Sequence, residues 1–212
     1  MIGYRNGGAS SDQDTYRGFE DVFRGPEERV AERQAAYLEL LTHHAPVLDV
    51  GCGRGELLDL LRERGLAYAG VDIDPGMVAR CRAKGHEAVE RASATEHLGG
   101  LRDASLGAIF SAQVIEHLSY EELVRLFELS LSKLGPGGLL IVETVNPHSA
   151  QALKTFWVDL THKHPVFPEV ALALARTTGF ESAFVFHPNG TGNAEADRFR
   201  EGEYALVATR GG

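Results

Sequence analysis

The sequence predicts an α/β fold, doubly wound around a mostly parallel seven-stranded sheet with an antiparallel edge strand. Short apolar runs alternate with amphipathic segments of helical length from residue 46 to residue 178, a pattern typical of parallel strands joined by helices. The first apolar run ends in a glycine-rich turn. The last two apolar runs have no helical segment between them, so we expect these two strands to pair antiparallel at one edge.

The first element expected is an amphipathic helix, because Pro26 suits a first helical turn and apolar residues recur at helical spacing up to Leu41. Further helices are expected around residues 57–61 and over residues 75–84, 120–134 and 168–178. The expected strands are short and apolar and cover residues 46–50, 67–73, 87–89, 106–111, 139–143, 180–186 and 204–209. Residues 144–167 are expected to form a long connection, and long ordered connections are often functional.

Length and composition predict one globular domain. The chain has 212 residues, of which 43% are hydrophobic and 24% are charged, which is ordinary usage for a globular α/β domain. We therefore expect residues 1–212 to form a single domain. Residues 1–25 begin with a stretch rich in glycine, serine and asparagine and are expected to form a flexible N-terminal segment.

Charge and cysteine content exclude several classes of partner. The formal net charge is -9, and an acidic surface repels phosphate backbones, so no nucleic-acid partner is expected. No apolar run reaches membrane-spanning length, and the polar start of the chain predicts no signal peptide. Cys52 and Cys81 do not form a metal-type or redox-type pair. A cytoplasmic location is therefore expected.

A glycine-rich turn and two acidic residues indicate a Rossmann-like nucleoside site. Asp49, Gly51 and Gly53 lie at the end of the first strand, and Asp72 lies at the end of the second. Glycines let the backbone approach a ligand closely, and a carboxylate at the second strand end can accept hydrogen bonds from ribose hydroxyls. The separation is close to the roughly 20 residues expected for such a site. The alternative is a tight strand-to-helix turn in an unrelated α/β protein.

The run VLDVGCGRG at residues 47–55, followed by Gly70-Val71-Asp72, resembles the signature of class I S-adenosylmethionine-dependent methyltransferases. The resemblance implies that Asp49, Gly51 and Gly53 surround the methionine part of the cofactor. It further implies that Asp72 holds the ribose, with Ile73 as a neighbouring cofactor contact. Asp74 is better explained as a helix N-cap before Pro75.

The family often carries an acidic residue after the third strand that binds the adenine amino group. Residues 91–97 read RASATEH and contain no aspartate. Ser93 or the backbone of Ala94 is therefore expected to take its place.

The reaction centre is expected beyond the fourth and fifth strands, where Gln113-Val114-Ile115-Glu116-His117 follows the fourth. Methyl transfer to a hydroxyl requires removal of its proton by a base, or help from a metal. The run is similar to the E-x-x-E-H metal motif of the small-RNA 2′-O-methyltransferases and the ubiquinone-pathway O-methyltransferases, with Gln113 replacing the first carboxylate. This resemblance implies Glu116, His117 and His162 as catalytic residues and as ligands of a divalent metal such as Mg²⁺. Gln113 would be a weak fourth ligand beside the cofactor.

Two structural explanations compete with that assignment. His117 could simply cap or pack at the start of the following helix, and His162 could be a surface residue of a loop.

Four segments resemble bacterial polysaccharide methyltransferases, which include O-antigen chain terminators and mycobacterial methylmannose polysaccharide O-methyltransferases. The segments are YRGFEDVFRG at residues 16–25, Glu116-His117, Asn146-Pro147, and DLTH at residues 159–162. This resemblance implies a sugar hydroxyl of a mannose-type oligosaccharide as acceptor. Tyr16 and Arg24 would then belong to a lid and contact the cofactor, Arg24 through its carboxylate. The alternative makes them plain helix residues.

Other functions stay open at this point. A small-molecule or quinone-type O-methyltransferase would use the same machinery, and a non-catalytic S-adenosylmethionine-binding regulatory module would need only the nucleoside site. An RNA methyltransferase fits the acidic charge poorly, and a NAD-dependent dehydrogenase is a remote option. The oligomeric state is not determined by the sequence, and a homodimer is compatible with it.

Overall fold

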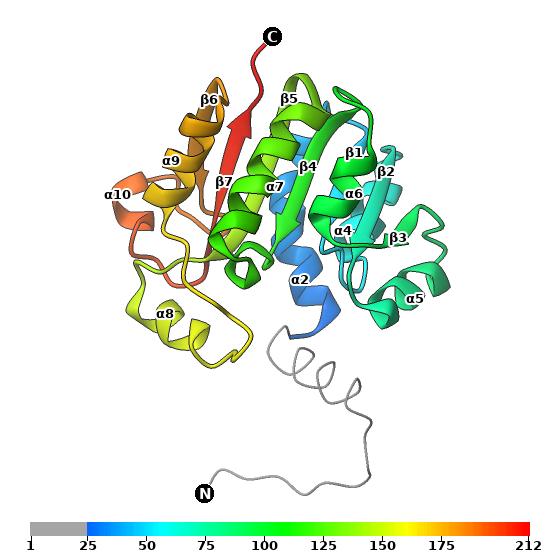
Figure 1. Ribbon diagram of the computed structural model, residues 1–212. Helices are drawn as coiled ribbons and strands as arrows, with labels where there is room; N and C mark the ends of the chain where they lie inside the picture. The colour runs from blue at the N-terminus through cyan, green and yellow to red at the C-terminus, as the bar shows by residue number, and fades with distance from the viewer. Residues whose placement is uncertain (1–24) are drawn as a thin grey trace, which may run out of the picture.

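A computed structural model describes residues 25–212. Its strands form one seven-stranded sheet in the order β3-β2-β1-β4-β5-β7-β6 (Figure 1). The strands, in chain order, are β1 (Val47–Val50), β2 (Tyr68–Asp72), β3 (Val89–Arg91), β4 (Leu106–Ala112), β5 (Leu134–Val145), β6 (Ser182–Phe186) and β7 (Glu203–Thr209).

Strand pairing is parallel from β3 through β5, and β7 pairs antiparallel with both β5 and β6. The predicted doubly wound sheet with antiparallel pairing at one edge is therefore confirmed. β7 lies one position in from that edge, and β6 occupies the edge itself. Because β6 and β5 are both antiparallel to β7, they run in the same direction. The end of β6 consequently lies at the same edge of the sheet as the carboxyl ends of β1, β2, β4 and β5.

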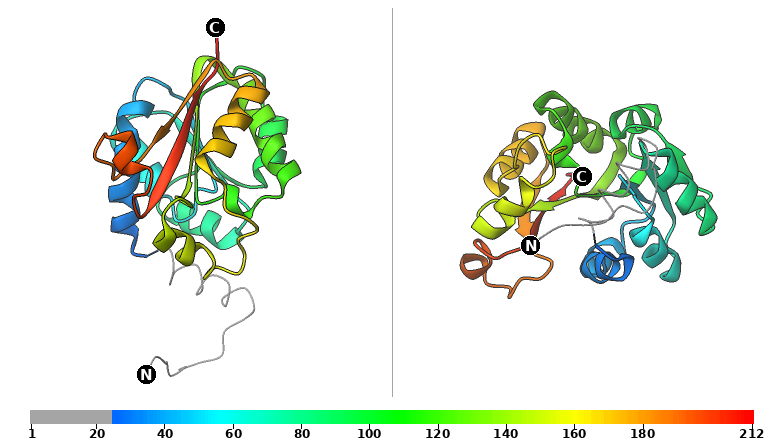
Figure 2. Two further views of the ribbon diagram at one scale, coloured as in Figure 1. Left: turned by 90° about the vertical axis from the view of Figure 1, so that its left-hand side faces the viewer. Right: turned by 90° about the horizontal axis from the view of Figure 1, so that it is seen from below.

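Helices cover both faces of the sheet (Figures 1 and 2). The helical elements are α2 (Glu27–Gln34), η1 (Ala35–Tyr37), α3 (Leu38–Leu41), α4 (Glu56–Glu63), α5 (Pro75–Ala83), α6 (Ala94–Gly100), η2 (Ile115–His117), α7 (Tyr120–Lys133), α8 (Ala150–Phe156), α9 (Pro168–Thr178) and α10 (Ala194–Asp197). One apolar core joins α6, α7 and α9 to one face. A second core joins the α2–α3 region and α4 to the other face, and α5 packs beside α4 through Val78 and Cys81.

Local signals explain where the main helices begin and end. Asp74 caps α5 by accepting from the backbone of Gly76 and Met77, as predicted, with Pro75 as the first helical residue. Ser119 forms a capping box at the start of α7. Proline also begins α9, and Gly179 ends it in the left-handed conformation, at φ 109°.

Four short elements were not predicted: α6, η2, α8 and α10. α6 ends in two glycines, which are poor helix formers, and α8 lies inside the segment expected to be a connection. The expected first helix is also interrupted by the 3-10 turn η1. Such short elements carry too few residues for a periodic apolar pattern.

No helix within residues 25–212 is long and apolar enough to cross a membrane. The predictions for Tyr16, Arg24 and the N-terminal lid fall outside the described residues.

Candidate functional site

The glycine turn lies between β1 and α4, at the carboxyl edge of the sheet. Gly51 and Gly53 both adopt positive φ, at 72° and 53°. A Cβ atom at Gly51 would overlap the Cγ2 atom of Val114, which follows β4. The turn therefore needs glycine at residue 51 for two reasons, backbone conformation and close packing.

Asp72 holds this turn in place from the end of β2. Its Oδ2 accepts a hydrogen bond from Gly53 N at 2.9 Å, and its Oδ1 accepts one from Asp74 N at 2.8 Å. Each carboxylate oxygen can accept more than one hydrogen bond, which is the chemistry that ribose hydroxyls require. Ile73, the next residue, is 68% exposed. A half-buried carboxylate beside an exposed apolar side chain fits a nucleoside, which has a polar sugar and an apolar base.

A buried ion pair, which the sequence analysis missed, anchors the turn. Arg54 Nε lies 2.8 Å from Glu56 Oε1, and both residues are nearly inaccessible to solvent. Arg54 also donates from Nη2 to the carbonyl of Gly25 at 3.0 Å. The only sequence signal is an Arg-x-Glu run directly after the glycines, which alone does not distinguish a buried pair from an exposed one.

Ser93 serves as the N-cap of α6. Its hydroxyl contacts Glu96 Oε2 at 2.8 Å, and its backbone N–H donates to the same oxygen at 3.1 Å. This capping box occupies both of the donors that Ser93 carries. Adenine contacts from Ser93 and Ala94 remain a prediction.

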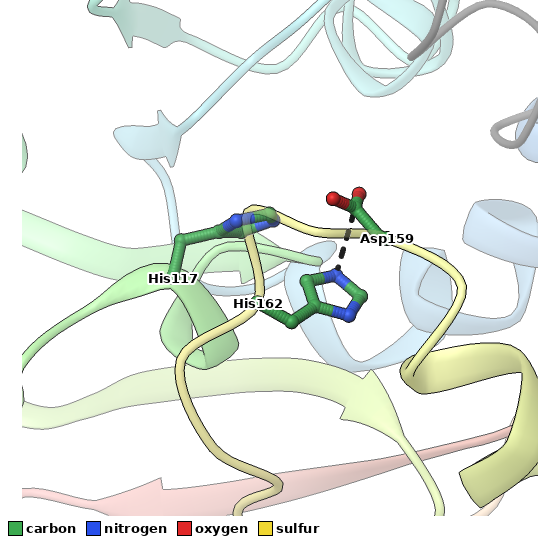
Figure 3. A group of neighbouring side chains, drawn as sticks. All are labelled: His117, Asp159 and His162. Atoms are coloured by element: carbon green, nitrogen blue, oxygen red, sulfur yellow. Dashed lines mark ion pairs between the residues drawn. The ribbon is translucent and has the colours of Figure 1, made fainter.

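His117, Asp159 and His162 come together at the end of β4 (Figure 3). One potential ligand atom from each lies within 4.8 Å of the others. His117 is the last residue of η2, whereas Asp159 and His162 belong to the connection between α8 and α9. The structure thus unites two predicted residues with Asp159, which the sequence analysis included in the DLTH segment without giving it a role.

Thr161 links His117 to Asp159. Its Oγ1 lies 2.6 Å from Asp159 Oδ1 and 3.0 Å from His117 Nδ1. An ionised carboxylate only accepts hydrogen bonds, so the hydroxyl donates to Asp159 and accepts from His117 Nδ1–H. This arrangement assigns the lone pair to His117 Nε2, the atom that can take a proton or bind a metal.

His162 is fixed in the same tautomer by a different partner. Its Nδ1 lies 2.8 Å from the carbonyl oxygen of Phe156, which can only accept. Its Nε2 lies 3.6 Å from Asp159 Oδ2, the pair marked in Figure 3. The ring packs against those of Phe156 and His117, at centroid distances of 4.4 Å and 4.6 Å.

Asp159 carries the negative charge of this group. Burial alone would raise its pKa. The hydrogen bonds from the hydroxyl and backbone of Thr161, together with the positive charge that His162 and His117 carry when they are protonated, outweigh burial and hold the pKa below its usual value.

Glu116, predicted as a ligand and catalytic residue, lies outside this group. Its side chain is 0% exposed, and burial raises its pKa to about 8. The carboxylate that lies beside the two histidines is that of Asp159. The predicted roles of Glu116 stay predictions.

Gln113 adopts a positive φ of 57° directly after β4. Its Nε2 donates to Glu143 Oε1 at 3.3 Å, and its backbone N–H donates to the carbonyl of Glu143 at 2.9 Å. The side chain therefore interacts with β5. The predicted roles of Gln113 as a cofactor contact and a weak metal ligand stay predictions.

Comparison with known proteins identifies the family of the chain. Residues 21–182 match the family described as a methyltransferase domain. The chain belongs to this methyltransferase family. A crystal structure of an S-adenosylmethionine-dependent methyltransferase from Archaeoglobus fulgidus is 31% identical, with a TM-score of 0.81, over 92% of this chain and 99% of that one. Family membership confirms the predicted methyltransferase class.

Two curated relatives are similar to the methyltransferase over part of their length. A protein of Mycolicibacterium smegmatis, named as a probable S-adenosylmethionine-dependent methyltransferase, is 31% identical over 71% of this chain and 58% of its own. A ubiquinone biosynthesis O-methyltransferase of Xylella fastidiosa is 29% identical over 58% of this chain and 52% of its own. The chain spans about half the length of these relatives.

Proposed function

We propose that the protein is an S-adenosylmethionine-dependent O-methyltransferase acting on a sugar hydroxyl, in a mannose-type oligosaccharide of polysaccharide biosynthesis. The observation that carries the O-methyltransferase proposal is the hydrogen-bonded chain from Asp159 through Thr161 to His117. It provides a base at the carboxyl edge of the sheet, near the glycine turn. The sugar acceptor rests on the resemblance of four segments to polysaccharide methyltransferases.

The residues of the turn would hold the cofactor. Asp49, Gly51 and Gly53 would surround its methionine part, and Asp72 and Ile73 would contact its nucleoside. When bound, S-adenosylmethionine supplies an electrophilic methyl carbon on a sulfonium. The protein contributes position and the removal of one proton.

His117 would accept that proton at Nε2. As the imidazole becomes charged, its Nδ1–H bond to Thr161 strengthens, and Thr161 passes the stabilisation on to the Asp159 carboxylate. This is the role of an orienting acid in a base–acid pair, here with a hydroxyl between the two groups. His162 closes the other side of Asp159 and helps to hold the carboxylate ionised.

The same three side chains could hold a divalent metal. Two imidazoles and one carboxylate suit Mn²⁺ or Zn²⁺, whereas Mg²⁺ prefers oxygen ligands. A metal would lower the pKa of an acceptor hydroxyl. His117 Nε2 cannot ligate a metal and accept a proton at once, so the metal and the unaided base are alternative uses of one site.

A second candidate is a small-molecule or quinone-type O-methyltransferase. Relatives named as ubiquinone biosynthesis O-methyltransferases favour it. So do the exposed side chains of Trp157, Val158 and Leu160, which flank Asp159 and offer an apolar surface to an aromatic acceptor.

The deciding experiment measures release of S-adenosylhomocysteine with mannose oligosaccharides and with a catechol, each with and without EDTA. Turnover on mannosides supports the proposal, and turnover on the catechol alone supports the second candidate. Loss of activity in EDTA would assign the metal role. Cofactor binding without turnover on either class would contradict both enzymatic proposals and favour a regulatory module.

His117→Ala should lower kcat about 10²- to 10⁴-fold in this assay and leave cofactor affinity unchanged. His43→Ala is the matched control, because His43 is exposed and lies before β1.

A further inference from the structure

A pocket of about 580 Å³ lies at the carboxyl end of the edge strand β6, away from the glycine turn. Its lining residues come from the segment before α8, the start of α9, the end of β6 and the stretch that leads to β7. Figure 1 shows where these elements lie. Its walls include apolar side chains from three segments, namely Pro168, Leu172, Val185, Phe186 and Pro188. Polar groups line the remainder, namely His148, Glu169, His187, Thr191, Asp197 and Arg198.

Strand order places this pocket on the far side of His117 from the cofactor turn. Along the carboxyl edge, β1 and β2 carry the turn, β4 leads to His117, and β5, β7 and β6 follow. Three strand spacings separate β4 from β6, which is about 14 Å. A ligand that reached from His117 into the pocket would be longer than a single sugar ring.

The segment between β5 and α9, which carries Asp159 and His162, also borders the pocket. His148, near its start, lines the pocket, and its ring packs against that of Phe167, near its end, at 5.2 Å. Pro168 follows directly and is part of the wall. The reaction centre and the pocket thus share one segment of chain.

Each charged group of the pocket already has a hydrogen-bonding partner. Glu169 accepts from Arg198 at 2.9 Å and lies 2.9 Å from His148 Nε2. Asp197 accepts from the backbone of Thr191 and Gly192, at 2.8 Å and 3.0 Å. Two carboxylates beside one guanidinium disfavour an anionic ligand, and the partners that these groups already have favour a neutral ligand over a cation.

His187 offers a neutral hydrogen-bonding ring to the pocket. It belongs to the lining, and burial is the main cause that lowers its pKa, against opposing contributions from Asp197 and the backbone of Glu203. Its ring is therefore neutral near pH 7 and can both donate and accept a hydrogen bond.

We propose that this pocket binds a distal sugar unit of an oligosaccharide acceptor whose reacting hydroxyl lies at His117. Apolar walls with a few fixed hydrogen-bonding groups, whose charges already have partners, suit a sugar, which has an apolar ring face and many neutral hydroxyls. The inference rests on the proposed function and makes it more specific: the preferred acceptor is longer than one unit.

The test compares mannose with its disaccharide, trisaccharide and tetrasaccharide, using the full chain and S-adenosylmethionine. In the wild type, KM should fall as the acceptor lengthens. Arg198→Ala should raise KM for the longer acceptors about tenfold, which corresponds to about 1.4 kcal/mol. KM for mannose, kcat and cofactor affinity should stay unchanged.

A second variant and a control keep the result interpretable. Leu172→Trp should fill the pocket, and it should likewise raise KM for the longer acceptors while leaving KM for mannose unchanged. A thermal melt checks that the variant is folded. Arg200→Ala is the matched control, since Arg200 is exposed on the same loop but does not line the pocket.

The experiments distinguish an error in the pocket proposal from an error in the proposed function. Suppose that mannosides are methylated with a KM that depends neither on the length of the acceptor nor on Arg198. This result would refute sugar binding in the pocket and would support the proposed function. Calorimetry with S-adenosylhomocysteine and the tetrasaccharide covers the reverse case. Binding that Arg198→Ala weakens, without turnover on any mannoside, would keep the pocket and overturn sugar methylation.

Discussion

His117 Nδ1 and Thr161 Oγ1 lie 3.0 Å apart, although 44 residues separate them in sequence. The same hydroxyl lies 2.6 Å from Asp159 Oδ1. The donor and the acceptor of both hydrogen bonds are therefore determined. The tautomer of His117 is therefore set by Thr161. In the proposed mechanism Thr161 is a positioning residue, because it acts through His117.

Thr161→Val should lower kcat about 10- to 100-fold, because Nδ1–H of His117 loses its acceptor and the wrong tautomer becomes populated. Cofactor affinity should not change. Thr161→Ser restores the hydroxyl and should recover most of the activity. A valine variant with wild-type kcat would show that the chain does not control the base. The measurement is steady-state release of S-adenosylhomocysteine, beside calorimetric titration of cofactor.

Asp159, and not Glu116, should determine metal affinity. Asp159→Ala removes the carboxylate of the three-residue group and should weaken Mn²⁺ binding by about 10- to 100-fold. Glu116→Gln changes a buried, largely protonated carboxyl to its amide and should leave Mn²⁺ binding intact. Titration of Mn²⁺ followed by electron paramagnetic resonance measures both. The opposite ranking would return Glu116 to the ligand set.

Gly51→Ala and Gly65→Ala form a matched pair for the cofactor turn. Both glycines have a positive φ, 72° and 68°, and an alanine in that conformation costs about 1–2 kcal/mol. Only at Gly51 would the added Cβ overlap a neighbour, Val114. Overpacking adds about 1–3 kcal/mol.

Gly51→Ala should therefore unfold at lower urea than Gly65→Ala and should bind S-adenosylhomocysteine more weakly. Gly65→Ala should bind it normally, since Gly65 lies after α4. Equal losses of stability and affinity in the two variants would contradict the tight packing of Gly51.

Glu203 should make stability depend on pH. Burial raises its pKa above 4.5, Glu143 reinforces this, and the ion pair with Arg33 at 2.9 Å opposes it. Between pH 4.5 and the raised pKa, the carboxyl of Glu203 is therefore protonated in the folded state and ionised in the unfolded state. The stabilisation is fully present below pH 4.5 and is lost as pH rises through the raised pKa.

Glu203→Gln removes the titrating group, so the free energy of unfolding of the variant should fall less with rising pH than that of the wild type. The difference between the two proteins should therefore grow in favour of the variant as pH rises. Urea denaturation at a series of pH values gives the comparison. Glu201→Gln, at an exposed neighbour, is the control and should follow the wild type. A Glu203→Gln curve parallel to that of the wild type would refute the assignment.

The sequence by itself determined the order of the strands and main helices, the turn at Gly51 and Gly53, and Asp72 at the end of β2. These features follow from patterns that are local: apolar periodicity, proline and aspartate at helix starts, and glycine where φ is positive. A residue at the end of a parallel strand is also placed by the topology alone.

Only the tertiary structure decided which acidic residue joins the histidines. Glu116 and His117 are neighbours in one short 3-10 turn, yet Glu116 is fully buried and His117 lies beside Asp159. Neighbours in so tight a turn point about 120° apart, so sequence proximity does not predict a shared site. The link through Thr161 and the pocket beside β6 likewise depend on how distant segments pack at one edge of the sheet, and no local pattern encodes that.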